Sequence, residues 1–255
     1  MILDLSQLYQ WHEHFLPDSF IKKLNGHGLL SQEDVALLVE ACGRPNDVPA
    51  GKDLIREGDR PGPLFVILEG WACRYKLLPE GTRQITAILM AGDIFDLHAF
   101  VLDRMEHTIA TLTSARVAMI PRERLEGLIE ARPAITRAFL WTQLVDEDTL
   151  RAWLVSLGRR DTLQRVAHLM CELYVRARNI GLAQDGRLDL PLTQVVLGDA
   201  LGLTSVHVNR VLRKLRMSGV MELSAGSLTI ADLDKLVGVA GFDGGYLHRR
   251  LRRVA

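Results

Sequence analysis

The sequence has no apolar run near the roughly 18 residues that a membrane-spanning helix needs. Its first residues, which include Asp4 and Glu13, also lack the basic region and apolar core of a secretory signal. Cysteine is scarce: Cys42, Cys73 and Cys171 are far apart and give neither a disulfide framework nor a CxxC metal pair. These absences exclude a membrane-spanning or disulfide-stapled protein, and we expect a cytoplasmic protein with reduced thiols.

Catalytic motifs are equally scarce. His12 and His14 are two residues apart, so on a helix they would point about 200° away from each other and would not form a zinc pair. The glycine-rich run from Gly238 to Gly245 follows no buried strand and lacks the Lys-Ser/Thr of a P-loop. We find no nucleophile and base pair, so we do not expect an enzyme, and we interpret residues 237–255 as a flexible basic tail.

The overall charge is balanced, with 31 Lys and Arg against 31 Asp and Glu, but the two halves differ. Residues 158–255 contain 15 Lys and Arg against 9 Asp and Glu, whereas residues 1–157 contain 16 against 22. A basic segment gains affinity for nucleic acid by releasing counterions from phosphates, and an acidic one is repelled. The pattern therefore predicts two domains, with nucleic acid bound by the second.

The run from Leu192 to Leu215 predicts two short amphipathic helices joined by a tight turn. Thr193 and Thr204 are suited to cap the two helices, and Gly202 is suited to end the first because it reaches left-handed backbone angles. The second helix keeps its apolar residues on one face and leaves a polar, basic face that is almost free of acids. A pair of this kind also occurs in helical bundles, but here its context favours a helix-turn-helix that binds DNA.

That context is a hairpin just downstream. Val220–Leu223 and Ser227–Ile230 alternate apolar and polar residues around Ala225-Gly226, which is typical of two strands joined by a tight turn. A hairpin packed against the two helices is a wing, so the sequence predicts a winged helix-turn-helix.

The region from Val48 to Ile120 predicts a small antiparallel barrel or jelly roll, because short apolar runs alternate with glycine-marked turns. The expected strands are Leu64–Leu68, Ala72–Leu77, Gln84–Met90, Thr108–Leu112 and Arg116–Ile120. The fold class is therefore α+β.

The residues from Pro133 to Leu157 predict one long helix with apolar residues on more than one face. Two apolar faces need two partners, and we expect these to be the barrel of the same chain and the same helix of a second subunit. A helix buried inside a monomer is the alternative. After it, residues 163–174 give the core stripe of the DNA-binding domain, and Asn179–Asp189 is expected to be a polar loop.

The helix-turn-helix, together with Leu54–Asp59, Leu64–Ile67 and Gly70, resembles the CRP/FNR family of bacterial transcription regulators from about Leu30 to Leu236. The resemblance implies a cyclic-nucleotide-binding-like sensor domain (1–132), a dimerisation helix (133–158) and a winged helix-turn-helix domain (159–236). It also implies a homodimer on a near-palindromic site in double-stranded DNA, with RNA polymerase as a further partner.

The same resemblance assigns roles to residues of the helix-turn-helix. Thr193 and Thr204 fall where family members contact phosphates, and His207 is a phosphate neighbour. Ser205, Val206 and Arg210 fall where side chains face base edges. The full set of expected DNA-binding residues is Thr193, Thr204, Ser205, Val206, His207, Asn209, Arg210 and Arg213. Arg210 is the main specificity residue, because a guanidinium can donate two hydrogen bonds to guanine.

The effector side of the resemblance is weaker. Members that bind cyclic nucleotides carry Gly-Glu and a later Arg-Ser or Arg-Thr, whereas this chain has Gly92-Asp93 and His107-Thr108. Losing the arginine argues against cyclic AMP, and three scattered cysteines argue against an iron–sulfur cluster. Haem bound by His98, His107 or Cys73 is left open, so the cofactor is unknown, and Asp93, His107 and Thr108 mark the expected effector pocket.

Three functions follow from these patterns. The first is a dimeric transcription regulator that responds to an unidentified signal at the N-terminal barrel. The second is a regulator of the same kind that has no ligand. The third is a small-molecule or haem-sensing signalling module whose basic domain acts on protein partners.

Overall fold

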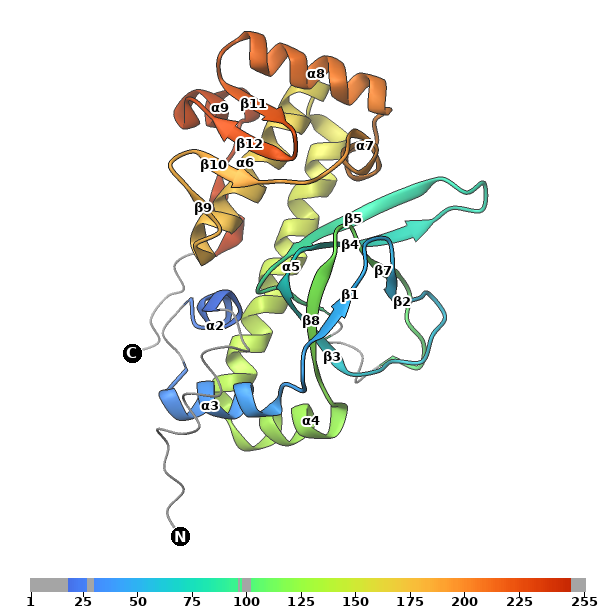
Figure 1. The fold of residues 1–255 in the computed structure, drawn as a ribbon, viewed down its shortest axis with the longest axis vertical. Coiled ribbons are helices and arrows are strands. Elements are labelled where there is room, and N and C mark those ends of the chain that lie inside the picture. Colours follow the sequence, from blue (N-terminus) through green and yellow to red (C-terminus); the bar gives the residue numbers. More distant parts are fainter. Residues whose placement is uncertain (1–17, 27–29, 96, 98–101, 249–255) are drawn as a thin grey trace. The chain divides into compact units, whose positions relative to one another are not determined.

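A computed structural model of the protein describes residues 18–26, 30–95, 97 and 102–248, and these residues form two compact units (Figure 1). The first unit contains the residues up to Cys73 and Leu89–Gln143, and the second contains Arg74–Ile88 and the residues from Leu144 onward. Helices and mostly antiparallel strands make up both, as the α+β prediction requires. Within the described residues, no helix is both long and apolar enough to cross a membrane.

Two four-stranded sheets form the jelly roll. In the first sheet β1 (Asn46–Val48), β8 (Ala115–Ile120), β3 (Leu64–Glu69) and β6 (Ile94–Phe95) lie in that order, and the neighbours are antiparallel. The second has the order β2 (Asp53–Ile55), β7 (Thr108–Thr111), β4 (Trp71–Leu77) and β5 (Arg83–Met90). Of the predicted antiparallel barrel or jelly roll, the jelly roll is thus confirmed, with its strands in two sheets.

The five expected strands correspond to β3, β4, β5, β7 and β8, with ends that agree to within about two residues. The strands β1, β2 and β6 were not predicted, and they are only two or three residues long. Strands of this length are too short to show alternation, because the pattern needs about four residues to be distinguishable.

The core of the first unit lies between the first sheet and four helices: α2 (Asp18–Leu24), α3 (Gln32–Ala41), α4 (Arg122–Ala131) and the beginning of α5 (Pro133–Arg159). Phe20 from α2 and Phe139 from α5 are both almost fully buried in this cluster. The long helix α5 follows the predicted span and runs two residues further. Pro133 is suited to its first position, where a missing N–H costs nothing.

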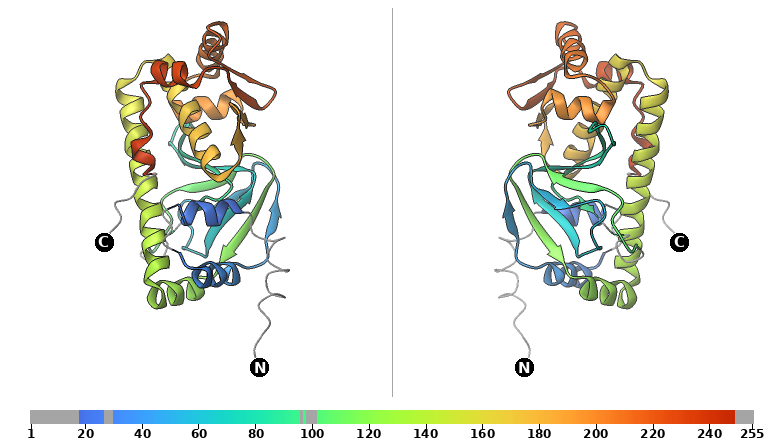
Figure 2. Two further views of the ribbon diagram at one scale, coloured as in Figure 1. Left: turned by 90° about the vertical axis from the view of Figure 1, so that its left-hand side faces the viewer. Right: turned by 90° about the vertical axis from the view of Figure 1, so that its right-hand side faces the viewer.

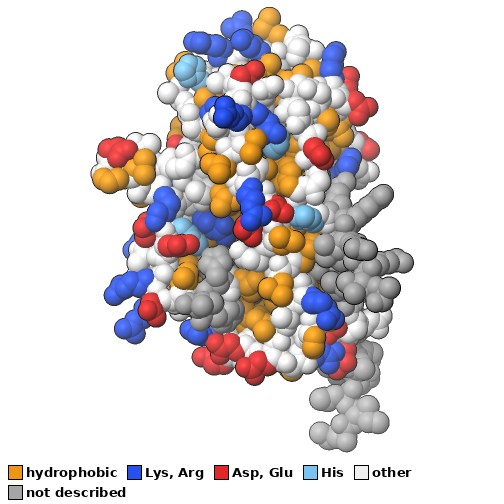
Figure 3. Space-filling view, turned by 180° about the vertical axis from the view of Figure 1, so that it is seen from behind, with side chains coloured by type: hydrophobic (Ala, Val, Ile, Leu, Met, Phe, Trp, Pro, Cys, Tyr) orange, Lys and Arg blue, Asp and Glu red, His pale blue; other side chains and the backbone are white. Residues whose placement is uncertain are grey.

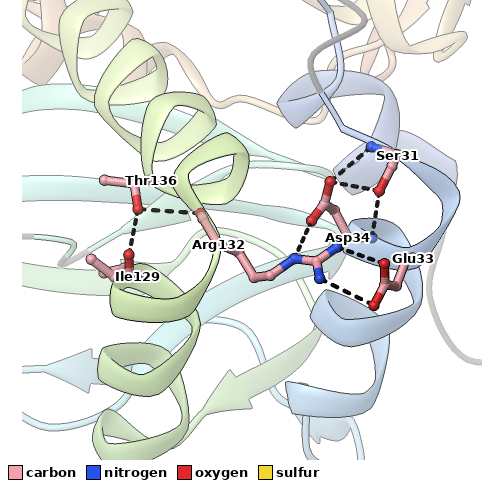
Figure 4. Close-up of polar contacts among 6 residues, drawn as sticks. All are labelled: Ser31, Glu33, Asp34, Ile129, Arg132 and Thr136. Atoms are coloured by element: carbon pink, nitrogen blue, oxygen red, sulfur yellow. Dashed lines mark hydrogen bonds and ion pairs between the residues drawn. The ribbon is translucent and has the colours of Figure 1, made fainter.

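Arg132, between α4 and α5, connects these helices to α3 (Figure 4). Its guanidinium donates to the buried carboxylate of Asp34 at 2.8 Å and to Glu33 at 3.1 Å. Asp34 also completes the capping box of α3 with Ser31. The Ser31 hydrogen bonds and the nearby guanidinium hold the pKa of Asp34 below its usual range, so this carboxylate stays charged in the folded protein.

The second unit contains α6 (Thr162–Ile180), α7 (Gln194–Leu201), α8 (Ser205–Met217) and α9 (Leu233–Ala240). Its sheet has the order β11 (Met221–Ser224), β12 (Ser227–Ile230), β10 (Arg187–Asp189) and β9 (Ala183–Gln184). The predicted wing is β11 and β12, and the left-handed angles of Ala225 and Gly226 make its turn. The long core helix is α6.

The expected polar loop from Asn179 to Asp189 is wrong, because it contains the hairpin of β9 and β10. Asp185 and Gly186 both have positive φ, at 50° and 75°, and close the turn. The side chain of Leu188 is buried, and its strand pairs with β12 opposite Leu228. The wing therefore belongs to a four-stranded sheet.

The C-terminal residues also differ from expectation, because α9 continues to Ala240 and a second short helix follows it, where we expected a flexible tail from residue 237. Asp232 caps α9, and after Gly241 a short 3-10 helix, η2 (Gly244–Leu247), follows. Leu236 and Leu247 are buried. In both views of Figure 2 the chain after α9 (red) runs alongside α5 (yellow). The rest of the expected tail, 249–255, lies outside the described residues.

His168 on α6 is 2% exposed and lies against the rings of Phe242 and Tyr246, at 5.1 and 6.0 Å between centroids. Burial, with a smaller effect of Arg160, lowers its pKa to about 4. As the pH falls below about 6.5, the unfolded chain therefore binds a proton that the folded chain excludes. We expect the free energy of unfolding to fall between pH 6.5 and 4, by up to about 1.4 kcal/mol per pH unit from this residue.

Chemical denaturation of the wild type and of a His168→Leu variant at several pH values measures this contribution. The variant should show a shallower decline over that range, whatever its stability at pH 7. Equal slopes in the two proteins would contradict the prediction.

Candidate nucleic-acid interface

Helices α7 and α8 are positioned by three local devices. The hydroxyl oxygen of Thr193 accepts a hydrogen bond from the Val196 amide at 3.2 Å, and that of Thr204 accepts from the His207 amide at 3.3 Å. Gly202 ends α7 in the left-handed conformation, with φ of 62°. All three capping predictions are confirmed. Only Gly202, Leu203 and Thr204 separate the two helices, so their geometry is that of a helix-turn-helix.

One face of α8 packs and the opposite face is exposed. Val208, Val211 and Leu215 are buried, each within 5% exposure. The opposite side chains, which follow one another at helical spacing, are exposed: Val206, Asn209, Arg210 and Arg213. The apolar side chain of Val206 is 66% exposed. The helix thus presents an apolar contact and two guanidinium groups on one face.

The other predicted residues lie around this face. His207 is exposed on one flank of α8, and Ser205 is half-buried on the other. Thr193 and Thr204 are exposed at the first residues of their helices, where backbone N–H groups favour an anion. Each threonine oxygen accepts an amide hydrogen bond, so its own proton stays available to a phosphate. The eight predicted residues therefore lie on α8 and at the N-caps of α7 and α8, within one motif.

The charge around the motif is mainly positive. Lys and Arg side chains gather at the end of the molecule where α8 lies (Figure 3). Helix α7 contains one acid, Asp199, and its carboxylate pairs with Arg83 at 2.7 Å within the same unit. Glu222 of the wing lies 3.7 Å from Arg216 of α8. These acids are partly neutralised by neighbouring guanidinium groups, which leaves the exposed face of α8 basic.

Gly198 is a structural residue of this motif that the sequence analysis missed. It lies inside α7, and a Cβ atom at this position would meet the backbone oxygen of Leu203 at 2.5 Å. The Leu203 amide in turn donates to the Gly198 carbonyl at 3.0 Å. Helix α7 therefore contacts the turn so closely that only glycine fits. A glycine inside a predicted helix was the available signal, because it usually marks close packing.

The expected effector residues are already engaged within the first unit. The Asp93 carboxylate, 2% exposed, pairs with Lys23 of α2 and accepts the Met90 amide at 2.9 Å. Thr108, at the start of β7, accepts the Glu57 amide at 3.1 Å, and His107 is 6% exposed. Asp93 precedes β6 of the first sheet, whereas Thr108 belongs to the second. Their grouping in an effector pocket stays a prediction.

Two domain families match this chain, one in each half of the sequence. Residues 45–132 match the cyclic nucleotide-binding domain, and residues 164–238 match the Crp-like helix-turn-helix domain. The chain belongs to the CRP/FNR family of transcription regulators. The match ends at residue 238, so the part of this CRP/FNR protein that contains η2 lies beyond the family's domain.

Named relatives of this CRP/FNR protein are similar along most of its length. It is 29% identical to the nitrogen fixation regulation protein FixK of Bradyrhizobium diazoefficiens, covering 86% of this chain and 91% of that protein. A probable transcriptional activator of Rhizobium leguminosarum is also 29% identical, over 74% of this chain and 78% of that one. The structure of FixK2 from Bradyrhizobium japonicum has a TM-score of 0.72 at 23% identity, covering 79% and 98% of the chains.

The thiols of this CRP/FNR protein are poorly disposed to bind a metal. Burial raises the pKa of Cys42 and of Cys171 to about 12, and the thiolate is the form that ligates. Cys73 is fully buried, and no cluster of three His, Cys, Asp or Glu able to hold a metal occurs in the described part of the chain. His98 lies outside the described residues. The expectations about cyclic AMP, iron–sulfur and haem therefore stay predictions.

Proposed function

We propose that the protein is a homodimeric transcription regulator that places α8 in the major groove and reads bases chiefly through Arg210. The observation that carries this proposal is the exposed face of α8. It combines two arginines with Asn209 and Val206, and it lies opposite a fully packed face. An arginine reads guanine by two parallel hydrogen bonds, and a small apolar side chain is suited to the thymine methyl group. Thr193 and Thr204 would hold flanking phosphates.

The dimer is supported by a second set of exposed apolar residues. Leu140 and Leu154 of α5 are 64% and 71% exposed, and Leu144 lies between them on the same face. Glu147 and Arg151, paired with each other, occupy the middle of this stripe. The spacing is that of a coiled-coil seam, in which central polar residues fix the register. Two parallel copies of α5 would place the two recognition helices on half-sites about 34 Å apart.

A Leu154→Glu substitution should convert the protein to a monomer. In a dimer two glutamates would face each other in an apolar seam, and like charges without partners are strongly unfavourable there. Analytical ultracentrifugation over a concentration series measures the change. Met217→Glu is the control, because Met217 is 75% exposed but belongs to α8. A dimer of unchanged affinity in the Leu154→Glu variant would contradict the proposed seam.

We assign the sensing of the controlling signal to the jelly roll. We also propose that the protein acts in the cytoplasm and that RNA polymerase is its protein partner. Because Asp93 is already paired with Lys23, a regulator that needs no small ligand is as compatible with these contacts as a sensor.

Selection from a random DNA library, followed by titration of the selected site and a scrambled site, tests this function. We expect a near-palindromic consensus and an affinity at least about 1000-fold above that for scrambled DNA. The logarithm of the association constant should fall linearly with the logarithm of the salt concentration, with a slope of about −0.9 for each phosphate contacted. Enrichment of no common sequence, with equal binding to both probes, would overturn the proposal.

A further inference from the structure

The segment that follows α9 packs back onto two helices of its own unit. Gly241 ends α9 in the left-handed conformation, and Asp243 caps η2 by accepting the Gly245 amide at 2.9 Å. Leu247 is then 5% exposed. This segment lies beyond residues 164–238, which match the helix-turn-helix domain.

Its strongest contact is with a buried carboxylate. Glu172 of α6 is completely buried, and its Oε2 atom accepts from the Tyr246 hydroxyl at 2.9 Å and from the Trp153 indole N–H of α5 at 2.9 Å. Arg176 donates to the other oxygen at 3.3 Å. One carboxylate thus connects α5, α6 and η2. A buried carboxylate that loses a donor is destabilised, so the three elements hold one another in place.

A second contact lies further back along α5. The imidazole of His248 pairs with Asp148, which also accepts from Arg151. The rings of Phe242 and Tyr246 enclose His168 of α6 on the same segment. Residues 242–248 therefore contact α5 directly at Asp148 and α6 at His168 and Glu172. Through Glu172, which also accepts from Trp153, they are connected to a second position on α5. The segment lies beside α5 in Figure 2.

The connection between α5 and α6 determines where the recognition helix α8 lies. Helix α5 ends at Arg159 and α6 begins at Thr162, so only two residues connect them. Arg165 of α6 donates to the carbonyl of Arg160 at this joint and to the carbonyl of Leu201 at the end of α7. A change in the angle between α5 and α6 therefore carries α7, and with it α8, relative to the dimerisation helix.

We propose that residues 242–248 form a clasp that fixes the angle between α5 and α6 and so sets the half-site spacing that the dimer accepts, with Tyr246 as the positioning residue. This inference rests on the proposed function. A dimer binds two half-sites together only when their spacing matches that of its recognition helices, and a mismatch removes the gain from bivalent binding. Loosening the joint must broaden the range of accepted spacings.

The test uses the selected operator with its half-sites moved apart or together in steps of one base pair, and also a single half-site. Wild type is compared with Tyr246→Phe, with a chain ending at Gly241, and with a chain ending at His248 as the matched control. Wild type and the control should lose about 10- to 100-fold in affinity away from the preferred spacing. For Tyr246→Phe and for the shorter chain, the affinities at the preferred spacing and at other spacings should be nearly equal. Both variants should bind the single half-site with wild-type affinity. Full spacing preference in both variants would overturn the clasp.

Hydrogen exchange tests the clasp without an operator and in variants of lower stability. Hydrogen exchange of the full-length protein reports on the joint directly, and amides of α5 from Asp148 onward should exchange faster in Tyr246→Phe than in wild type. Exchange that is unchanged there would overturn the clasp. Failure of wild-type protein to select DNA would overturn the proposed function and leave the exchange result to decide about the clasp.

Discussion

An Arg210→Ala variant should lose about 5- to 150-fold in affinity for a single half-site of the selected operator, which corresponds to about 1–3 kcal/mol, and more for the whole operator, which has two half-sites. The reason is geometric as well as electrostatic. Arg210 is exposed on the central line of the α8 face, and its guanidinium can form two parallel hydrogen bonds with guanine. Its removal should also relax the base preference at one position of each half-site. Repeating the selection with the variant and comparing the two consensus sequences measures that change.

Two further variants separate base reading from charge. Arg210→Lys keeps the positive charge but loses the planar fork, so it should keep the salt dependence and still lose base preference. Lys235→Ala removes one charge from an exposed position on α9, and it should leave the preference unchanged. If Arg210→Ala selects the wild-type consensus with wild-type affinity, Arg210 does not read bases.

A Gly198→Ala variant should be strongly destabilised and should bind DNA poorly. The added methyl group would lie 2.5 Å from the Leu203 carbonyl oxygen, and both atoms belong to tightly placed elements of the helix-turn-helix. Overpacking of this kind costs about 1–3 kcal/mol. The melting temperature should therefore fall by about 4 °C per kcal/mol, because the size of the second unit lies between the two size classes for which this shift is known.

Gly238→Ala is the matched control for this change. Gly238 also lies inside a helix of the second unit, but a Cβ there meets nothing within 4 Å. Alanine is the better helix former, so this variant should gain about 0.5–1 kcal/mol. A Gly198→Ala variant that was as stable as Gly238→Ala would show that the turn has room to move.

The parts of the site that could be predicted from the sequence are those with local causes. Thr193, Gly202 and Thr204 each act within about four residues, so capping and turn rules were sufficient to place both helices. The wing followed from Ala225-Gly226 between two alternating runs. The family resemblance then supplied the order of the domains, which no local rule contains.

The missed features depend on contacts between residues far apart in the chain. Asp93 is paired with Lys23, 70 residues earlier, and Tyr246 reaches Glu172, 74 residues earlier. Composition made the C-terminal segment look like a linker because its glycines are frequent, whereas its few large side chains determine its packing. The hairpin at Asp185-Gly186 did carry a local signal, since Asp-Gly is a favoured hairpin turn, but its strands are too short for alternation.

The two capping positions, 193 and 204, accept fewer residue types in a DNA-binding protein than helix capping alone would allow. Aspartate caps a helix about as well as threonine does, so helix stability alone would permit either residue at positions 193 and 204. A carboxylate there would place a negative charge beside the DNA backbone and has no proton to donate to a phosphate. In the proposed role, repulsion by the DNA thus excludes aspartate from both caps and leaves uncharged capping residues such as threonine, serine or asparagine, a restriction that the folded chain by itself does not impose.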